Sequence, residues 1–275
     1  MKKLVFTLAT CCIMCACEQK TETNPFFTEF RTEYGAPDFD KIKIEHYEPA
    51  FLKGIEEQNA EIKAIVESRE TPGFENTIVA LDNSGRTLAR VKGVFYALTE
   101  ADTNDEMSAL SEKIAPVLSE HNDNIYLNQD LYKRVAAVWQ REQEGKITLT
   151  TEQHRLLDRY HKAFIRSGAG LDAGKQNRLR EINKELSTLA ITFSNHILNE
   201  NNAYRLVIDN EAELAGLPEW VKTGAAEEAK AVGKEGKWLF TLQNSSRLPL
   251  LQYADNRELR KDIYEAYINR GNNGD

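Results

Sequence analysis

Most of the chain repeats apolar positions with the period of an α-helix. After residue 36, apolar residues recur at steps of three and four, with Glu and Lys between them. This pattern is typical of helices that bury one face. The predicted helices cover about 46–68, 75–99, 103–118, 128–145, 150–168, 172–202, 219–232 and 255–270.

Capping signatures mark the starts of several of these helices. A side-chain oxygen at the first position accepts a hydrogen bond from a free N–H of the first turn, and a Glu or Gln three residues later often completes the exchange. The predicted caps are Thr103 with Glu106, Asn128, Thr150 with Gln153, and Asp255 with Glu258.

The longest predicted helix, 172–202, carries a continuous apolar seam. Alternating steps of three and four are typical of an antiparallel helix pair or of a helix in a bundle core. We favour the bundle core. The seam consists of Leu179, Ile182, Leu186, Leu189, Phe193 and Ile197.

The spacing of apolar residues departs from the helical period only after residue 203. Two short runs, 204–208 and 238–242, are rich in aromatic and branched residues and predict a small antiparallel β element. The expected fold class is therefore predominantly all-α. The tryptophans sit within apolar patterns, so we expect Trp139, Trp220 and Trp238 to lie in the core.

Composition and charge describe an ordinary globular protein with an acidic balance. Apolar residues make up 41% and charged residues 28%, and the net charge is −8. Nucleic-acid binding depends on clustered Lys and Arg, and the sequence has no basic run with interleaved aromatics. We predict no nucleic-acid partner, and no oligomeric state can be predicted.

The cysteines point to export. All four lie between positions 11 and 17, so the rest of the chain can form neither a disulfide nor a thiolate metal site. The start has the basic end and short apolar run of a secretory signal. We expect a signal peptide over 1–16 and a tether over 17–36.

Ala16 and Cys17 follow the apolar run and precede a polar stretch, which resembles a bacterial lipoprotein cleavage site. We predict lipidation of Cys17, with Cys15 as the second choice and a plain secretory signal as the alternative. The protein is then a periplasmic or outer-membrane lipoprotein of a Gram-negative bacterium, attached to the membrane only through its lipid.

Few residues form a pattern that carries chemistry. No two of the five histidines have the His-x-x-x-His spacing of a helical zinc site. The nearest pattern is His154, Asp158 and His161 on one helical face, but basic neighbours favour a solvated polar face instead. Tyr204 and Arg247 could contact a peptide, although no spacing selects them. We predict no catalytic and no metal-binding residue in this chain.

A series of sequence blocks resembles the thimet-oligopeptidase-like zinc metallopeptidases, most closely the bacterial peptidyl-dipeptidase branch. The blocks occur in the family's order across residues 24–275. They include PDFDKIKIEHYEPAF at 37–51, FENTIVALD at 74–82, ADTND at 101–105, IAPVLS at 114–119, RLLDRY at 155–160 and YADNRELR at 253–260.

The resemblance implies a mostly helical two-lobed enzyme around a channel that admits short peptides. One zinc is held by a His-Glu-x-x-His helix and a downstream Glu, and the Glu of the motif is the general base. This chain has no such motif. We therefore expect 37–275 to be the helical N-terminal region, which forms a wall of the channel, binds no zinc and is inactive alone.

Two hypotheses remain open. The first is the N-terminal part of an exported peptidyl-dipeptidase or oligopeptidase that cuts short peptides. The second is an autonomous helical lipoprotein that binds peptides or partners without catalysis. A fragment leaves apolar stripes unpaired, and we expect this on the last helix, at Leu259, Ile263, Tyr264 and Tyr267.

Overall fold

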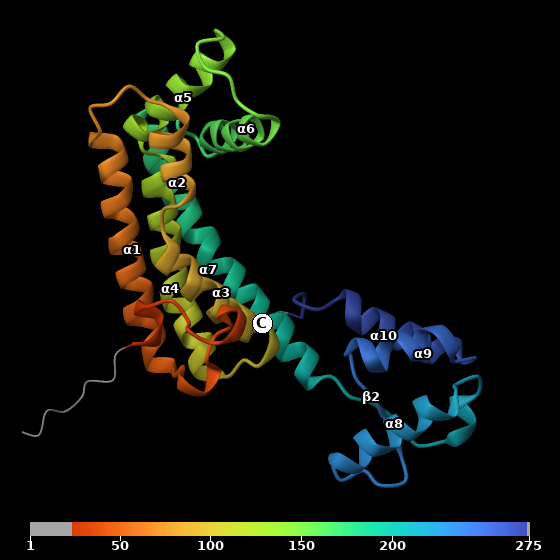
Figure 1. Cartoon of the computed structure of the whole chain (residues 1–275). Coiled ribbons are helices and arrows are strands. Elements are labelled where there is room, and N and C mark those ends of the chain that lie inside the picture. Colours follow the sequence, from red (N-terminus) through yellow and green to blue (C-terminus); the bar gives the residue numbers. More distant parts are fainter. Residues whose placement is uncertain (1–23, 274–275) are drawn as a thin grey trace, which may run out of the picture.

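The computed structural model describes residues 24–273 and is built almost entirely of helices (Figure 1). The predicted leader and Cys17 lie outside these residues. Three 3-10 turns come first, at Pro25–Phe27, Glu33–Gly35 and Phe39–Lys41. The helical body then contains α1 (Ile44–Glu67), a π-helical segment (Phe74–Val79), α2 (Ala80–Asp82), α3 (Arg86–Ala101), α4 (Asp105–Tyr126), α5 (Gln129–Gln143), α6 (Thr151–Arg166) and α7 (Ala173–Ala203).

A smaller unit follows the body. It contains β1 (Leu206–Ile208), a 3-10 turn (Glu211–Leu214), α8 (Glu219–Ala231), β2 (Trp238–Phe240), α9 (Asn244–Tyr253) and α10 (Arg257–Ile268). The two strands are antiparallel, with Leu206 opposite Phe240 and Ile208 opposite Trp238. The predominantly all-α class and the small β element predicted from the sequence are therefore confirmed.

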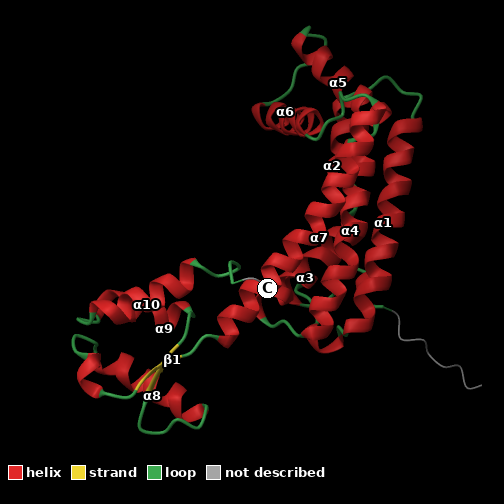
Figure 2. Ribbon diagram, turned by 180° about the vertical axis from the view of Figure 1, so that it is seen from behind, coloured by secondary structure: helices red, strands yellow, loops and turns green. Residues whose placement is uncertain are grey.

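The body is long, and α7 connects it to the smaller unit. Figure 1 and the opposite view in Figure 2 show α5 and α6 at one end of the body and the smaller unit beyond the other. α7 runs along α4 and leads directly into β1. Among the described helices, none has both the length and the apolar content that crossing a bilayer requires.

Three separate apolar clusters stabilise these parts. One joins α1, α3 and α4 around Phe51 and Phe95, whose rings meet edge to face at 5.3 Å. A second joins the far end of α1 to α5 and α6 around Leu131 and Phe164. The third lies in the smaller unit, where Phe240 of β2 is buried. Helix faces that the sequence marks as apolar are thus mostly covered.

Local capping was predicted correctly at two helices and was displaced by one residue at two others. Asn128 caps α5, and Thr150 exchanges hydrogen bonds with Gln153 at the start of α6. The caps of α4 and α10 are Asn104 and Asn256, whose side-chain oxygens accept from first-turn N–H groups. The predicted caps Thr103 and Asp255 were wrong, because the adjacent asparagine takes the position in each case.

The predicted continuous helix over 75–99 was also wrong. The chain turns after α2, and Gly85 adopts a φ of 73°, a left-handed conformation that favours glycine. The Gly85 N–H donates to Glu61 Oε2 on α1 at 2.7 Å. α3 therefore starts as a separate helix, held at this turn against α1.

The seam on 172–202 does not lie in a bundle core. The 31-residue α7 is the longest described helix, as predicted, but none of its residues is buried. α10 shows the reverse: Leu259 and Ile263 are buried, although Tyr264 is exposed. The unpaired apolar stripe expected on the last helix is found on α7 instead.

The contact between α1 and α3 generates a stability prediction. A Cβ on Gly54 of α1 would lie 2.8 Å from the backbone of Leu88 on α3, so Gly54→Ala forces the helices apart. We expect a loss of about 1–3 kcal/mol in the free energy of unfolding, measured by urea denaturation.

Gly93→Ala on α3 is the matched control. A Cβ there meets nothing within 4 Å, and we expect it to be neutral or stabilising by about 0.5–1 kcal/mol, because alanine favours the helix. Equal effects of the two substitutions would contradict the close approach at Gly54.

Candidate functional site

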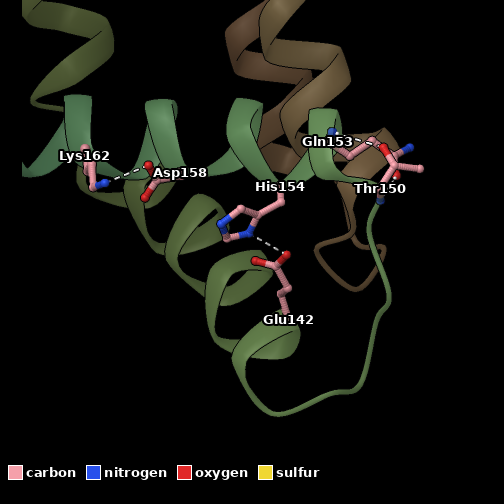
Figure 3. Close-up of polar contacts among 6 residues, drawn as sticks. All are labelled: Glu142, Thr150, Gln153, His154, Asp158 and Lys162. Carbon is pink, nitrogen blue, oxygen red and sulfur yellow. Dashed lines mark hydrogen bonds and ion pairs between the residues drawn. The ribbon is translucent and has the colours of Figure 1, made fainter.

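The histidine face of α6 packs against α5. Thr150 fixes the start of α6 and so sets the direction of His154, whose Nδ1 lies 2.8 Å from Glu142 Oε1 of α5 (Figure 3). Because a carboxylate only accepts hydrogen bonds, the imidazole donates through Nδ1. Asp158 is engaged elsewhere, with Lys162 Nζ at 2.7 Å from its Oδ2.

His161 is part of an aromatic stack. Its ring lies 4.6 Å from the ring of Trp139, with planes only 8° apart, and 6.3 Å from the ring of Tyr132. Burial lowers the pKa of His161 from its usual value of 6.5. The folded protein therefore favours the neutral imidazole, which suits a stacked packing role.

Each of the three residues on this face is engaged by a neighbour other than the remaining two. His154 is held by Glu142, Asp158 by Lys162 and His161 by Trp139, which favours the polar-face interpretation over a metal site. Within residues 24–273, no group of three or more His, Cys, Asp or Glu side chains is placed to hold a metal ion. These residues do not fit the zinc site that the resemblance implies.

A second candidate surface lies where the smaller unit meets the end of α7. A hollow of about 380 Å³ is bordered by α8, β2 and the start of α9. Its wall combines two aromatic residues, one guanidinium, one carboxylate and several amide and hydroxyl groups. The lining includes Asn201, Arg205, Trp220, Gly224, Thr241 and Ser246.

Trp220 is the main feature of this hollow, and its core assignment was wrong. Its side chain is 62% exposed, whereas Trp139 and Trp238 pack against apolar clusters. Gly224 lies one helical turn after Trp220 and leaves the adjacent surface open. An amphipathic ring beside polar donors and acceptors suits an extended peptide. The Trp220–Gly224 spacing in the sequence was the available signal.

Tyr204 and Arg247 lie outside this hollow. Tyr204 is partly buried against the apolar cluster of the smaller unit. Arg247 is only 8% exposed, and its guanidinium lies 3.5 Å from the centre of the Tyr267 ring. Its Nη2 donates to Asn244 Oδ1 at 2.6 Å. Arg247 therefore has a packing role within the smaller unit.

Comparison with known proteins gives a consistent set of relatives. No family model matches the chain. The chain is 39% identical to a dipeptidyl carboxypeptidase of Escherichia coli over 255 residues, which is 93% of this chain and 37% of the relative. It is 33% identical to an oligopeptidase A of Salmonella typhimurium over 248 residues, which is 90% of this chain and 35% of the relative.

A more distant relative has the same relation in length. Saccharolysin of Saccharomyces cerevisiae is 24% identical over 203 residues, 73% of this chain and 28% of the relative. The chain thus spans about a third of the length of the curated relatives that it matches.

The stack around His161 generates a pH prediction. Burial lowers the pKa of His161 in the folded state. Below about pH 6.5 the unfolded chain therefore binds a proton at His161 more readily than the folded protein does, and the folded protein loses stability as the pH falls further. His161→Phe keeps a ring beside Trp139 but cannot bind a proton. As the pH is lowered from 8 to 5, we expect the free energy of unfolding of the variant to rise relative to that of the unsubstituted protein.

The measurement is the free energy of unfolding by urea, followed through tryptophan fluorescence at several pH values. The difference between the two proteins should be constant above pH 7.5 and should change only at lower pH. A difference independent of pH throughout this range would show that His161 has the same pKa in the folded and unfolded states.

Proposed function

The chain belongs to the thimet-oligopeptidase-like zinc metallopeptidases, and from this premise we propose that it is the N-terminal part of an exported peptidase that hydrolyses short peptides. The observation that carries the proposal is the 39% identity to a dipeptidyl carboxypeptidase across 93% of the chain. The higher identity to that relative than to oligopeptidase A favours removal of dipeptides from peptide C-termini.

The structure supports a substrate-contact role for this part. The described residues contain long helices and a hollow with peptide-compatible groups. We assign these helices to a wall of the substrate channel, and the hollow at Trp220 to contact with an extended peptide. Binding there would orient the substrate without supplying a reacting group.

Zinc belongs, in this proposal, to the part of the peptidase beyond this chain. A bound zinc polarises the scissile carbonyl and lowers the pKa of a water molecule. No two histidines of the whole sequence have the spacing of the family's zinc helix. The 275-residue chain would therefore bind no stoichiometric zinc and would have no peptidase activity by itself.

The first test compares this chain with the polypeptide extended through a downstream His-Glu-x-x-His motif. We expect only the extended protein to contain about one zinc per molecule and to release dipeptides from peptide C-termini, because only it carries the metal ligands. Metal analysis and a quenched-fluorescent peptide assay, each with and without a chelator, provide the measurement.

Cleavage by the purified 275-residue chain that a chelator abolishes would refute this assignment. His154, Asp158 and His161 would then be substituted first. An extended protein that binds zinc but cleaves only internal bonds would retain the peptidase function and exclude the dipeptidase preference.

Export and lipid attachment form the second part of the proposal. The support is the sequence alone: a basic start, a short apolar run and four cysteines confined to positions 11–17. We propose that Cys17 is acylated and holds the enzyme at a periplasmic or outer-membrane surface. Short peptides produced outside the cytoplasm would then be its substrates.

Acylation at Cys17 is tested by intact-mass analysis of the protein isolated from a Gram-negative host. We expect the chain to start at Cys17 and to carry the mass of a lipid. Cys17→Ala should leave an unacylated precursor, and Cys15→Ala is the matched control that should be processed normally. A mature protein without lipid mass would establish plain secretion instead.

A further inference from the structure

An apolar stripe on α7 is left largely uncovered by the described residues. It consists of Ile182, Leu186, Leu189 and Phe193, which are 36%, 57%, 53% and 52% exposed. Their steps of four, three and four place them along one side of the helix. Contiguous exposed apolar surface of this kind marks an interaction site.

The stripe is turned away from α4, the helix on which α7 packs. Asn183 Nδ2 donates to Asp123 Oδ1 at 2.7 Å, and Asn195 Nδ2 donates to Glu112 Oε1 at 2.9 Å. Successive residues of a helix diverge by about 100°, so Ile182 does not share the direction of Asn183. Asn183 and Asn195 of α7 thus face α4, whereas the stripe lies on a different side of the helix.

The surroundings of the stripe suit a second helix. Near its N-terminal end lies a hollow of about 500 Å³, lined by Leu179 and Leu186 and by the polar residues Asp123 and Asn183. A hollow beside a ridge with steps of three and four is the surface into which side chains of another helix pack. α7 lies on the open side of the body, between α6 and the smaller unit (Figure 1).

The C-terminal segment of the chain returns to this stripe. A Cβ on Gly271 would lie 2.5 Å from Cε2 of Phe193, so the backbone at Gly271 lies directly against that ring. The Gly271 N–H and the Asn273 amide both donate to Glu200 Oε2, at 3.0 and 2.7 Å. The last described residues, 271–273, therefore lie beside the C-terminal end of the stripe.

We propose that the stripe on α7 is covered by an amphipathic helix from the part of the peptidase that this chain does not include. The inference rests on the proposed function, because the relatives are nearly three times as long as the region they share with this chain. The helix would lay its apolar face on Leu186, Leu189 and Phe193. α7 is then the central contact between the two parts of the enzyme.

The test uses the absence of cysteine after position 17, which allows single thiols to be placed at will. Leu189→Cys reports on the stripe, and Thr188→Cys, one exposed position earlier, is the matched control. Both are made with the four native cysteines removed, in this chain and in the polypeptide that the gene encodes beyond codon 275. The measurement is the rate of reaction with a maleimide.

We expect Leu189→Cys to react at least about tenfold more slowly in the extended protein than in the 275-residue chain, because a covered thiol reacts only when the contact opens. Thr188→Cys should react at similar rates in both. Leu186→Cys provides a second reporter, and far-UV circular dichroism verifies that each variant is folded.

The outcomes separate the inference from the proposed function. Equal rates for Leu189→Cys in an extended protein that cleaves peptides would overturn the inference and leave the function intact. Protection in an extended protein without peptidase activity would support the contact and refute the function. If protection of Leu189→Cys increased with the concentration of the 275-residue chain, the occupant would be a second copy and the inference would be overturned. A stop codon after residue 275 would also overturn the inference.

Discussion

The placement of everything after residue 203 depends on how α7 is held against α4. That contact includes hydrogen bonds from Asn183, Arg180 and Asn195, and none of the residues of α7 is buried. Each such bond contributes only about 0.5–1.5 kcal/mol net, because water competes for the same groups. These polar partners help to fix the direction of α7, and its apolar stripe remains available for a different contact.

The sequence predicts the local elements well and their coverage less well. Asn128 and Thr150 could be recognised as caps because the bonds they make involve only the next few residues. The break at Gly85 was missed, because it depends on Glu61 and Gln58 of another helix. α9 was not predicted at all. The spacing of apolar residues along α7 shows which side of the helix is apolar, but it does not show whether another element covers that side.

The same limit applies to the candidate sites. The spacing of His154, Asp158 and His161 permits a metal site. Their basic neighbours in the sequence argue against it, and the contacts with Glu142, Lys162 and Trp139 show how these side chains are engaged instead. Trp220 belongs to an apolar pattern, yet it is exposed because no described element covers that side of α8. Family membership could be inferred from the sequence alone, because it rests on many ordered sequence blocks rather than on one residue.

The first described residues limit how far the protein could lie from a membrane if Cys17 carries the proposed lipid. Phe26 is fully buried, Asn24 Nδ2 donates to the His46 carbonyl at 2.7 Å, and Arg90 Nη1 donates to the Phe26 carbonyl at 2.9 Å. The chain is thus fixed to the start of α1 from residue 24 onward. Six residues lie between Cys17 and Asn24, and the seven residue-to-residue steps between these two positions span at most about 25 Å when fully extended. A lipid on Cys17 would keep the first turn of α1 within that distance of the bilayer.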